Sequence, residues 1–336
     1  MARHVTVADI AREAGVSLMT VSRVINNKGD VSAATRQRVQ EVVERLGYRP
    51  SGIARSLATQ HTGTIGLVVP DVSNPFFADV VRGVEHVAYA GGYNVFLCNT
   101  EEDPQRELAI LQSLEEKRVD GVVLVTRLEA HQLQSVLERQ PAVVLINRRQ
   151  AKRKGTPIAV AVLLDDVGGG RTVTQHFLDR GHRSIGFLAG PTTSYSGSER
   201  GKGYRIALNA AGILYNPDWS RHCSPTVQGG HEAARELMLS HPELTALYCY
   251  NDLVAAGALQ ACAELGRAVP RDVAVAGSDD ISLAALVTPS LTTCRAPRYE
   301  LGGQAVRLLI NQIRGCPEEC KEIILPLELV IRASAP

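Results

Sequence analysis

From Thr64 onward, short apolar runs rich in β-branched residues alternate with longer segments of helical periodicity. Short continuous apolar runs are typical of buried strands, and strands separated by helices pair in parallel with helices on both faces of the sheet. The predicted strands are 65–69, 93–98, 121–125, 142–146, 184–189, 246–249 and 273–276, and the predicted helices are 76–90, 104–117, 167–180, 197–211, 230–239 and 253–265.

The opening strand of this series occurs twice. Residues 63–70 read Gly-Thr-Ile-Gly-Leu-Val-Val-Pro, and residues 182–190 read His-Arg-Ser-Ile-Gly-Phe-Leu-Ala-Gly. The repetition predicts two doubly wound parallel α/β lobes, which usually enclose a ligand cleft faced by the loops that follow the strands. We expect lobe one to take about 63–162 and 293–322, and lobe two about 163–292 and 323–336.

The first fifty residues follow a different, all-helical pattern. Thr6 and Asp9 form a helix start, and Gly15 ends that helix because glycine adopts the left-handed backbone of a tight turn. Ser17 caps a second helix over 18–25, and a third runs from Ser32 to about residue 46. Short helices joined by a glycine turn predict a helix-turn-helix domain over 1–50.

The second of these helices exposes a side-chain set that contains no acidic residue. Arg23 suits guanine or phosphate, and Leu18 and Met19 suit a thymine methyl group. A small helical interaction module with a solvated face is the alternative. The exposed set is Leu18, Met19, Thr20, Ser22, Arg23 and Asn26.

Charge separates the head from the body. The whole chain carries a formal net charge of +1, which argues against a nucleic-acid partner, but residues 1–60 carry +4 and the remainder −3. A basic head on a mildly acidic body suits one part for phosphates and another for a different ligand, although an ordinary fluctuation would also explain it.

Composition narrows the class of protein. Hydrophobic residues make up 45% of the chain, which excludes wholesale disorder. We find no apolar run near the ~20 residues of a membrane helix and no secretory leader, and the seven scattered cysteines suit a reducing compartment. A cytoplasmic protein is expected.

The head string Val5-Thr-Val-Ala-Asp-Ile-Ala-Arg-Glu-Ala-Gly-Val-Ser-Leu-Met-Thr-Val-Ser-Arg-Val-Ile-Asn, followed by Val31-Ser32 and Leu46-Gly-Tyr-Arg-Pro50, resembles the LacI/GalR family of bacterial transcriptional repressors. The resemblance implies that Leu18 and Met19 carry much of the operator preference. It also implies a body similar to periplasmic sugar-binding proteins. The positions implied to support base or phosphate contact are Ser17, Thr20, Ser22, Arg23 and Asn26, and we add the helix caps Thr6 and Ser32.

Residues 51–62 are predicted to form a hinge helix and linker. Pro50 blocks the preceding helix, Ser51 caps a new one over 52–58, and so short a helix is marginal in water without a partner. The resemblance implies that two copies pack in the DNA minor groove, with Leu57 wedged between base pairs. Arg55 of the same segment is a further candidate for DNA contact. An interdomain linker with a buried leucine is the alternative.

Candidate cleft residues follow the predicted strands, namely Asp71, Asn74, Phe76 and Arg148 in lobe one and Arg200, Asn251 and Asp279 in lobe two. Each also has a local explanation, such as a turn at Asn74 or a helix cap at Asn251. The resemblance implies that Arg200, Asn251 and Asp279 hold a small-molecule effector.

The chain departs from the family pattern at three of these regions. Ser278 stands where an aromatic residue is usual, Ala296 where glutamine is common, and Asp166 where asparagine is common. The lost amide and the added carboxylate put a simple neutral hexose in doubt as the effector.

The predicted function is an effector-controlled transcriptional repressor that binds a palindromic operator on double-stranded DNA as a homodimer. The chain has no heptad tail for a coiled-coil tetramer, no dinucleotide or phosphate loop, no serine-hydrolase elbow and no zinc-spaced histidines. We therefore expect no enzyme activity, no cofactor, no metal site and no membrane partner. A DNA-tethered enzyme acting on a metabolite and a ligand-independent architectural protein are the alternatives.

Overall fold

The computed structural model describes residues 5–25, 28–48, 61–140, 142–150, 159–316 and 322–336. The chain divides into two compact units, Met1–Thr62 and Gly63–Pro336. This division falls between the predicted hinge segment and the predicted body.

The first unit contains helices α1 (Val7–Ala14), α2 (Leu18–Ile25) and α3 (Ala33–Arg45). A reciprocal cap begins α1, because the Thr6 hydroxyl accepts from the Asp9 N–H at 3.3 Å and the Asp9 carboxylate accepts from the Thr6 N–H at 3.0 Å. Gly15 ends α1 at φ +64°. Ile10 and Val21 are fully buried between the helices. The predicted helix-turn-helix is confirmed.

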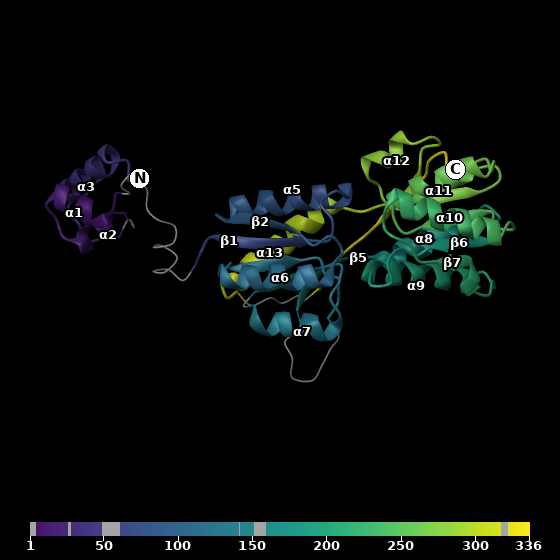
Figure 1. Ribbon diagram of the computed structural model, residues 1–336, viewed down its shortest axis with the longest axis horizontal. Coiled ribbons are helices and arrows are strands. Elements are labelled where there is room, and N and C mark those ends of the chain that lie inside the picture. Colours follow the sequence, from purple (N-terminus) through teal and green to yellow (C-terminus); the bar gives the residue numbers. More distant parts are fainter. Residues whose placement is uncertain (1–4, 26–27, 49–60, 141, 151–158, 317–321) are drawn as a thin grey trace. The chain divides into compact units, whose positions relative to one another are not determined.

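The body contains two sheets, one in each lobe (Figure 1). In lobe one the strand order is β11-β5-β4-β3-β1-β2, and all neighbours are parallel. Its elements are β1 (Thr64–Val69), α5 (Pro75–Ala90), β2 (Asn94–Asn99), α6 (Pro104–Glu116), β3 (Gly121–Leu124), α7 (Ala130–Arg139), β4 (Val143–Ile146), β5 (Val160–Leu164), α13 (Arg298–Ile313) and β11 (Glu322–Leu325).

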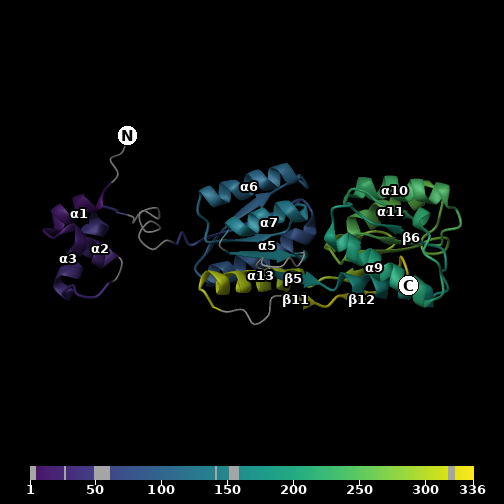
Figure 2. The ribbon, with the colours of Figure 1, turned by 90° about the horizontal axis from the view of Figure 1, so that it is seen from below.

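Successive strand residues point to opposite sides of this sheet, so both faces carry apolar side chains and both are covered by helices. Leu67 packs in the apolar cluster formed with α5 and α13, whereas its neighbour Val68 packs in the cluster formed with α6 and α7. Figure 2 shows α6 and α13 on opposite sides of the lobe. Gly83 of α5 allows α13 to approach closely, since a Cβ atom there would lie 2.0 Å from the Tyr299 carbonyl oxygen.

Lobe two repeats this plan with the strand order β12-β10-β9-β8-β6-β7. Its strands are parallel except that β12 runs antiparallel to β10. Its elements are α8 (Asp166–Asp179), β6 (Ile185–Leu188), α9 (Tyr195–Ala210), η1 (Pro217–Trp219), β7 (Ser220–Arg221), α10 (Val227–Ser240), β8 (Ala246–Cys249), α11 (Asp252–Glu264), β9 (Ala274–Asp279), α12 (Ser282–Leu286), β10 (Thr292–Arg295) and β12 (Glu328–Val330). The predicted α/β class with parallel-dominated sheets is confirmed.

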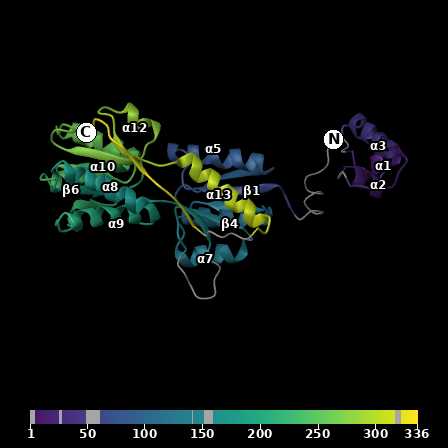
Figure 3. The same ribbon diagram turned by 180° about the vertical axis from the view of Figure 1, so that it is seen from behind.

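The chain passes between the lobes after β5, after β10 and between β11 and β12. The last of these crossings is the yellow segment that runs from one lobe to the other in Figure 3. The second crossing comes later than the expected position near 293, because β10 stays in the sheet of lobe two up to Arg295. Among the described residues, no helix is long and apolar enough to span a membrane, and no cluster of His, Cys, Asp and Glu suits a metal ion.

Candidate functional site

Helix α2 of the first unit presents apolar side chains to solvent. Leu18 is 56% exposed and Met19 67% exposed, although both belong to a helix whose other face is buried. Ser17 fixes the start of the helix, because its hydroxyl accepts from the Thr20 N–H at 3.1 Å. Arg23 is exposed as well. These positions agree with a surface that contacts another molecule rather than the core of the unit.

Other residues predicted to contact DNA have local roles or lie outside the described residues. Thr6 caps α1, and the Ser32 hydroxyl caps α3 by accepting from the Thr35 N–H at 3.3 Å. The exposed Ser22 lies on the same helix as Arg23. The residues outside the described ranges are Asn26, Arg55 and Leu57.

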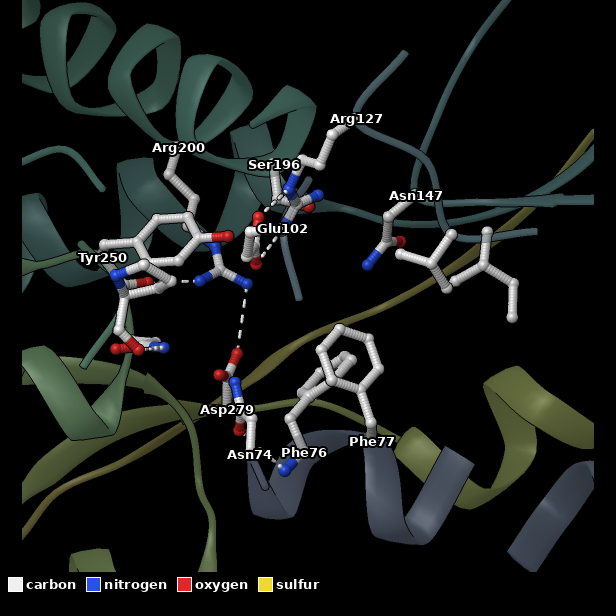
Figure 4. A pocket seen from close by; sticks show the side chains of 14 residues that line it. Asn74, Phe76, Phe77, Glu102, Arg127, Asn147, Ser196, Arg200, Tyr250 and Asp279 are labelled. Atoms are coloured by element: carbon white, nitrogen blue, oxygen red, sulfur yellow. Dashed lines mark hydrogen bonds and ion pairs between the residues drawn. The ribbon is translucent and has the colours of Figure 1, made fainter. Parts of the chain in front are cut away.

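A cavity lies between the two lobes of the body (Figure 4). The empty space it encloses, including the part open to solvent, is about 540 Å³. Lobe one contributes Asn74, Phe76, Phe77, Glu102, Val125, Arg127, Ile146 and Asn147, and lobe two contributes Ser196, Arg200, Pro225, Tyr250, Asn251 and Asp279.

Arg200 of α9 is the central cation of lobe two. Its side chain is only 4% exposed, and its guanidinium donates to Asp166 at 2.8 Å, to Asp279 at 3.2 Å and to the Tyr250 carbonyl oxygen. The guanidinium carbon also lies 5.3 Å from the centroid of the Tyr250 ring. Burial would lower the pKa of Arg200, but the two carboxylates raise it on balance, so the side chain stays charged.

Asp279 ends β9 beside this cation. Burial raises the pKa of its carboxyl to about 6; Arg200 opposes this shift, whereas Asp166 adds to it. Its backbone is strained, since a non-glycine residue rarely adopts a φ of +111°. Arg298 donates to the Asp279 carbonyl oxygen. Asp279 is thus held in one orientation by contacts on both its side chain and its backbone.

A second charged pair lies in lobe one. Arg127, after β3, donates to Glu102, after β2, through Nε at 2.6 Å and Nη2 at 3.1 Å. Glu107 of α6 is fully buried and accepts from the Arg127 backbone N–H at 3.0 Å. Burial raises the pKa of Glu107. Glu102 and Arg127 both line the cavity, and the two hydrogen bonds between them fix the positions of their charged groups.

Three asparagine side chains in the wall accept hydrogen bonds from the local backbone. The Oδ1 of Asn74 accepts from the Phe76 N–H at 3.0 Å, that of Asn147 from the Leu164 N–H at 2.9 Å, and that of Asn251 from the Val254 N–H at 2.9 Å. With one lone pair of the oxygen used locally, Asn74 and Asn147 offer a ligand mainly the two donors of their amide N–H₂. Phe76 and Phe77 pack edge to face, with centroids 5.1 Å apart.

The structure brings some of the residues selected from the sequence to this cavity and leaves others away from it. Among its candidates, the structure brings together Asn74, Phe76, Arg200, Asn251 and Asp279. Asp71 and Arg148 do not line the cavity, because the Asp71 carboxylate accepts from the backbone and hydroxyl of Ser73 and Arg148 donates to the Leu128 carbonyl oxygen at 3.2 Å. Burial also lowers the pKa of Arg148.

Four of the lining residues that were not selected from the sequence share one signal. Glu102, Arg127, Asn147 and Tyr250 each follow the carboxyl end of a strand, which is where ligands bind in parallel sheets.

The three residues that depart from the family pattern do not line the cavity. Asp166 supports Arg200 from outside the lining, and Ser278 and Ala296 are buried and do not line it either.

Comparisons with known proteins agree with both units. Residues 6–51 match the family described as "Bacterial regulatory proteins, lacI family", and residues 62–333 match "Periplasmic binding proteins and sugar binding domain of LacI family". The chain is 38% identical to the ribose operon repressor of Escherichia coli strain K12, with 98% of this chain and 99% of the relative covered. It is 36% identical to the transcriptional repressor PurR of Photobacterium profundum, with 98% of each covered.

A solved structure extends the likeness to three dimensions. The crystal structure of the lac repressor dimer bound to operator and an anti-inducer superposes with a TM-score of 0.86 at 27% identity, covering 99% of both chains. Neither the matched families nor these relatives support the alternative of a DNA-tethered enzyme. The chain belongs to the LacI family of bacterial transcriptional regulators, which combine a DNA-binding head with an effector-binding body.

Proposed function

We propose that this regulator is a repressor that is released from or recruited to its operator by a neutral sugar bound between the lobes. It acts as a homodimer in the cytoplasm and needs neither a cofactor nor turnover of the sugar. Residues 1–50 would bind DNA, 51–62 would form the hinge, and 63–336 would bind the effector.

The charge balance of the cavity carries the proposal for a neutral effector. Its charged lining side chains are Glu102, Arg127, Arg200 and Asp279, whose formal charges cancel, and each cation is paired with an acid of its own lobe. A sugar hydroxyl both donates and accepts, so it can bind to such pairs without leaving a buried charge uncompensated. The departure at Asp166 does not count against a neutral sugar, because Asp166 faces Arg200 and not the cavity.

Some of the similar proteins support the same class of effector. Three of them are ribose operon repressors, two from strains of Escherichia coli at 38% identity and one from Halalkalibacterium halodurans at 34%. D-Ribose is therefore the first neutral sugar to test. The proposed effector contacts are Asn74, Phe76, Arg200, Asn251 and Asp279.

Operator recognition is proposed to depend on α2. Leu18 and Met19 would read base edges in the major groove, and Arg23 would bind guanine or phosphate. Because phosphate neutralisation releases counterions, operator affinity should fall steeply with salt. The supporting contacts are proposed for Thr6, Ser17, Thr20, Ser22, Asn26 and Ser32, and the hinge contacts for Arg55 and Leu57.

Exposed apolar residues on lobe one support a homodimer. The edge strand β2 leaves Phe96 and Leu97 each 46% exposed, and Tyr89 of the neighbouring α5 is also exposed. Bare edge strands and apolar patches are usually covered in the functional assembly. A second copy would pair two recognition helices with the two halves of a palindrome.

Thermal-shift measurements of the full chain with D-ribose, ribose 5-phosphate, ribonate and a nucleoside test the proposal. D-Ribose should raise the melting temperature, because a ligand that binds only the folded state stabilises it. It should also change affinity for an operator selected from genomic fragments, and it should be recovered chemically unchanged. A shift with the anionic compounds alone, or consumption of the sugar, would contradict the proposal.

A further inference from the structure

The polar side chains of the cavity differ in what they still offer a ligand. Arg127 and Arg200 can only donate hydrogen bonds, and the asparagine oxygens of lobe one are already engaged by backbone N–H groups. Charged acceptors come from Glu102 in lobe one and Asp279 in lobe two. Each lobe thus brings one carboxylate to the cavity, and lobe one's carboxylate is not among the residues that sequence reasoning selected.

Glu102 is held in place for this role. Its carboxylate is gripped at both oxygens by Arg127, whose own side chain is 10% exposed, while Glu102 keeps 28% of its side chain exposed. Its backbone has a φ of +60°, so the turn after β2 directs it away from an ordinary extended path. Figure 4 shows Glu102 and Arg127 across the cavity from Phe76 and Phe77. The exposed lone pairs of Glu102 are available to hydroxyl groups.

An anionic ligand would meet an obstacle at this end of the cavity. A phosphate or carboxylate would lie against the negative charge of Glu102, and two of the Arg127 donors that could compensate, at Nε and Nη2, are already bound to that same side chain. An anionic ligand that used these two donors would have to displace Glu102. A neutral polyol needs no such displacement, because its hydroxyls donate to the carboxylate as it stands.

We propose that Glu102, fixed by Arg127, is a specificity-determining residue that accepts hydrogen bonds from effector hydroxyls and rejects effectors bearing a carboxylate or phosphate. This inference rests on the proposed function and names the residue that selects within its effector class. A pair that merely stabilised the loop would affect melting temperature and leave the ranking of ligands unchanged.

Glu102→Gln tests the charge at nearly constant shape, and Glu101→Gln is its matched control. Glu101 is the adjacent residue, also has a positive φ, pairs with Arg106 at 2.7 Å and does not line the cavity. Calorimetric titration of each full-length variant with D-ribose and with ribose 5-phosphate gives the ratio of the two affinities. We expect this ratio to fall at least about tenfold in Glu102→Gln and to stay at the wild-type value in Glu101→Gln.

Glu102→Asp keeps the negative charge but shortens the side chain by one methylene group. The shorter acid should bind D-ribose more weakly yet still reject ribose 5-phosphate, whatever its effect on melting temperature. A wild-type protein that prefers D-ribose and a Glu102→Gln variant with the same preference would overturn this inference alone. A wild-type protein that prefers ribose 5-phosphate would overturn the proposed effector class, and this inference with it.

Discussion

The cavity has a guanidinium–carboxylate pair in each lobe, and the two pairs are held very differently. In lobe two, Arg200 and Asp279 have side chains only 4% and 7% exposed, and Arg200 is also bound by Asp166 and by the Tyr250 carbonyl oxygen. In lobe one, Glu102 is considerably more exposed than either. We infer that the lobe-two pair, Arg200 and Asp279, is an anchor that holds any effector in place. The lobe-one pair, Glu102 and Arg127, is a selector that discriminates among effectors.

The difference has its origin in the backbone elements that carry each pair. Arg200 lies within α9, Asp279 ends β9 and Asp166 begins α8, so regular elements fix the lobe-two pair. Glu102 and Arg127 lie on the turns after β2 and β3. Sites on helices and strands are more rigid than sites on loops, whereas loops are where chains of one fold differ in specificity.

Removal of the lobe-two cation should have the largest effect. Arg200→Ala leaves Asp166 and Asp279 buried without their partner, and breaking a buried pair in this way costs ~3–5 kcal/mol. We expect the free energy of unfolding, measured with urea, to fall by about that amount, and effector binding to be lost. Arg127→Ala should cost less, because Glu102 can reach solvent. An equal loss in the two variants would end the distinction between anchor and selector.

The anchor was largely predictable from sequence and the selector was not. Arg200 and Asp279 follow from the strand pattern together with the family resemblance. Glu102 lies in the run Glu101-Glu102-Asp103, which is typical of a solvated turn. Nothing in that run signals that residues 101 and 102 both adopt positive φ, since this backbone is uncommon outside glycine.

Asp71 and Arg148 show the converse case, in which the sequence predicts a cavity residue that the structure places elsewhere. Both follow strands and were predicted to reach the cavity, yet Asp71 binds Ser73 and Arg148 binds the Leu128 carbonyl oxygen. The period of apolar residues predicts which strands and helices form and hence which edge of each sheet carries the site. The direction of a side chain on that edge depends on hydrogen bonds between loops, which sequence patterns do not encode.

Acidification should weaken the anchor by a smaller amount. Because the pKa of Asp279 is about 6, its carboxylate is lost below that pH, and D-ribose affinity should be constant above about pH 7 and fall about tenfold by pH 5. The groups facing it are Arg200, Asp166, Asp252 and Arg298.

Stability should respond in the opposite direction. The folded pKa of Asp279 is raised, so its contribution to stability is present below its unfolded pKa of ~4 and is lost as pH rises through about 6. Calorimetric titrations and urea unfolding from about pH 4 to about pH 8, with Asp279→Asn as reference, measure both quantities. An affinity that rises on acidification would show that Asp279 binds the effector as a neutral acid.

The smallest effect is expected at Asp166, the acid that stands where the family commonly has asparagine. In Asp166→Asn the amide oxygen can still accept from Arg200 Nε, so the anchor keeps its geometry and D-ribose affinity at pH 7.5 should change by less than about threefold. The charge of Asp166 raises the pKa of Asp279, so its removal should move the acid loss of affinity to lower pH.

Asp165→Asn is the matched control, because Asp165 caps α8 by accepting from the Gly168 N–H at 2.9 Å, a role that asparagine performs equally well. Calorimetric titrations of both variants across the same pH range make the comparison. Asp166→Asn could instead weaken binding at pH 7.5 as severely as Arg200→Ala. That result would show that the anchor depends on the negative charge of Asp166 and not on the position of the Arg200 guanidinium. If Asp166→Asn only shifted the pH dependence, geometry would set the affinity of lobe two and charge would set its pH range.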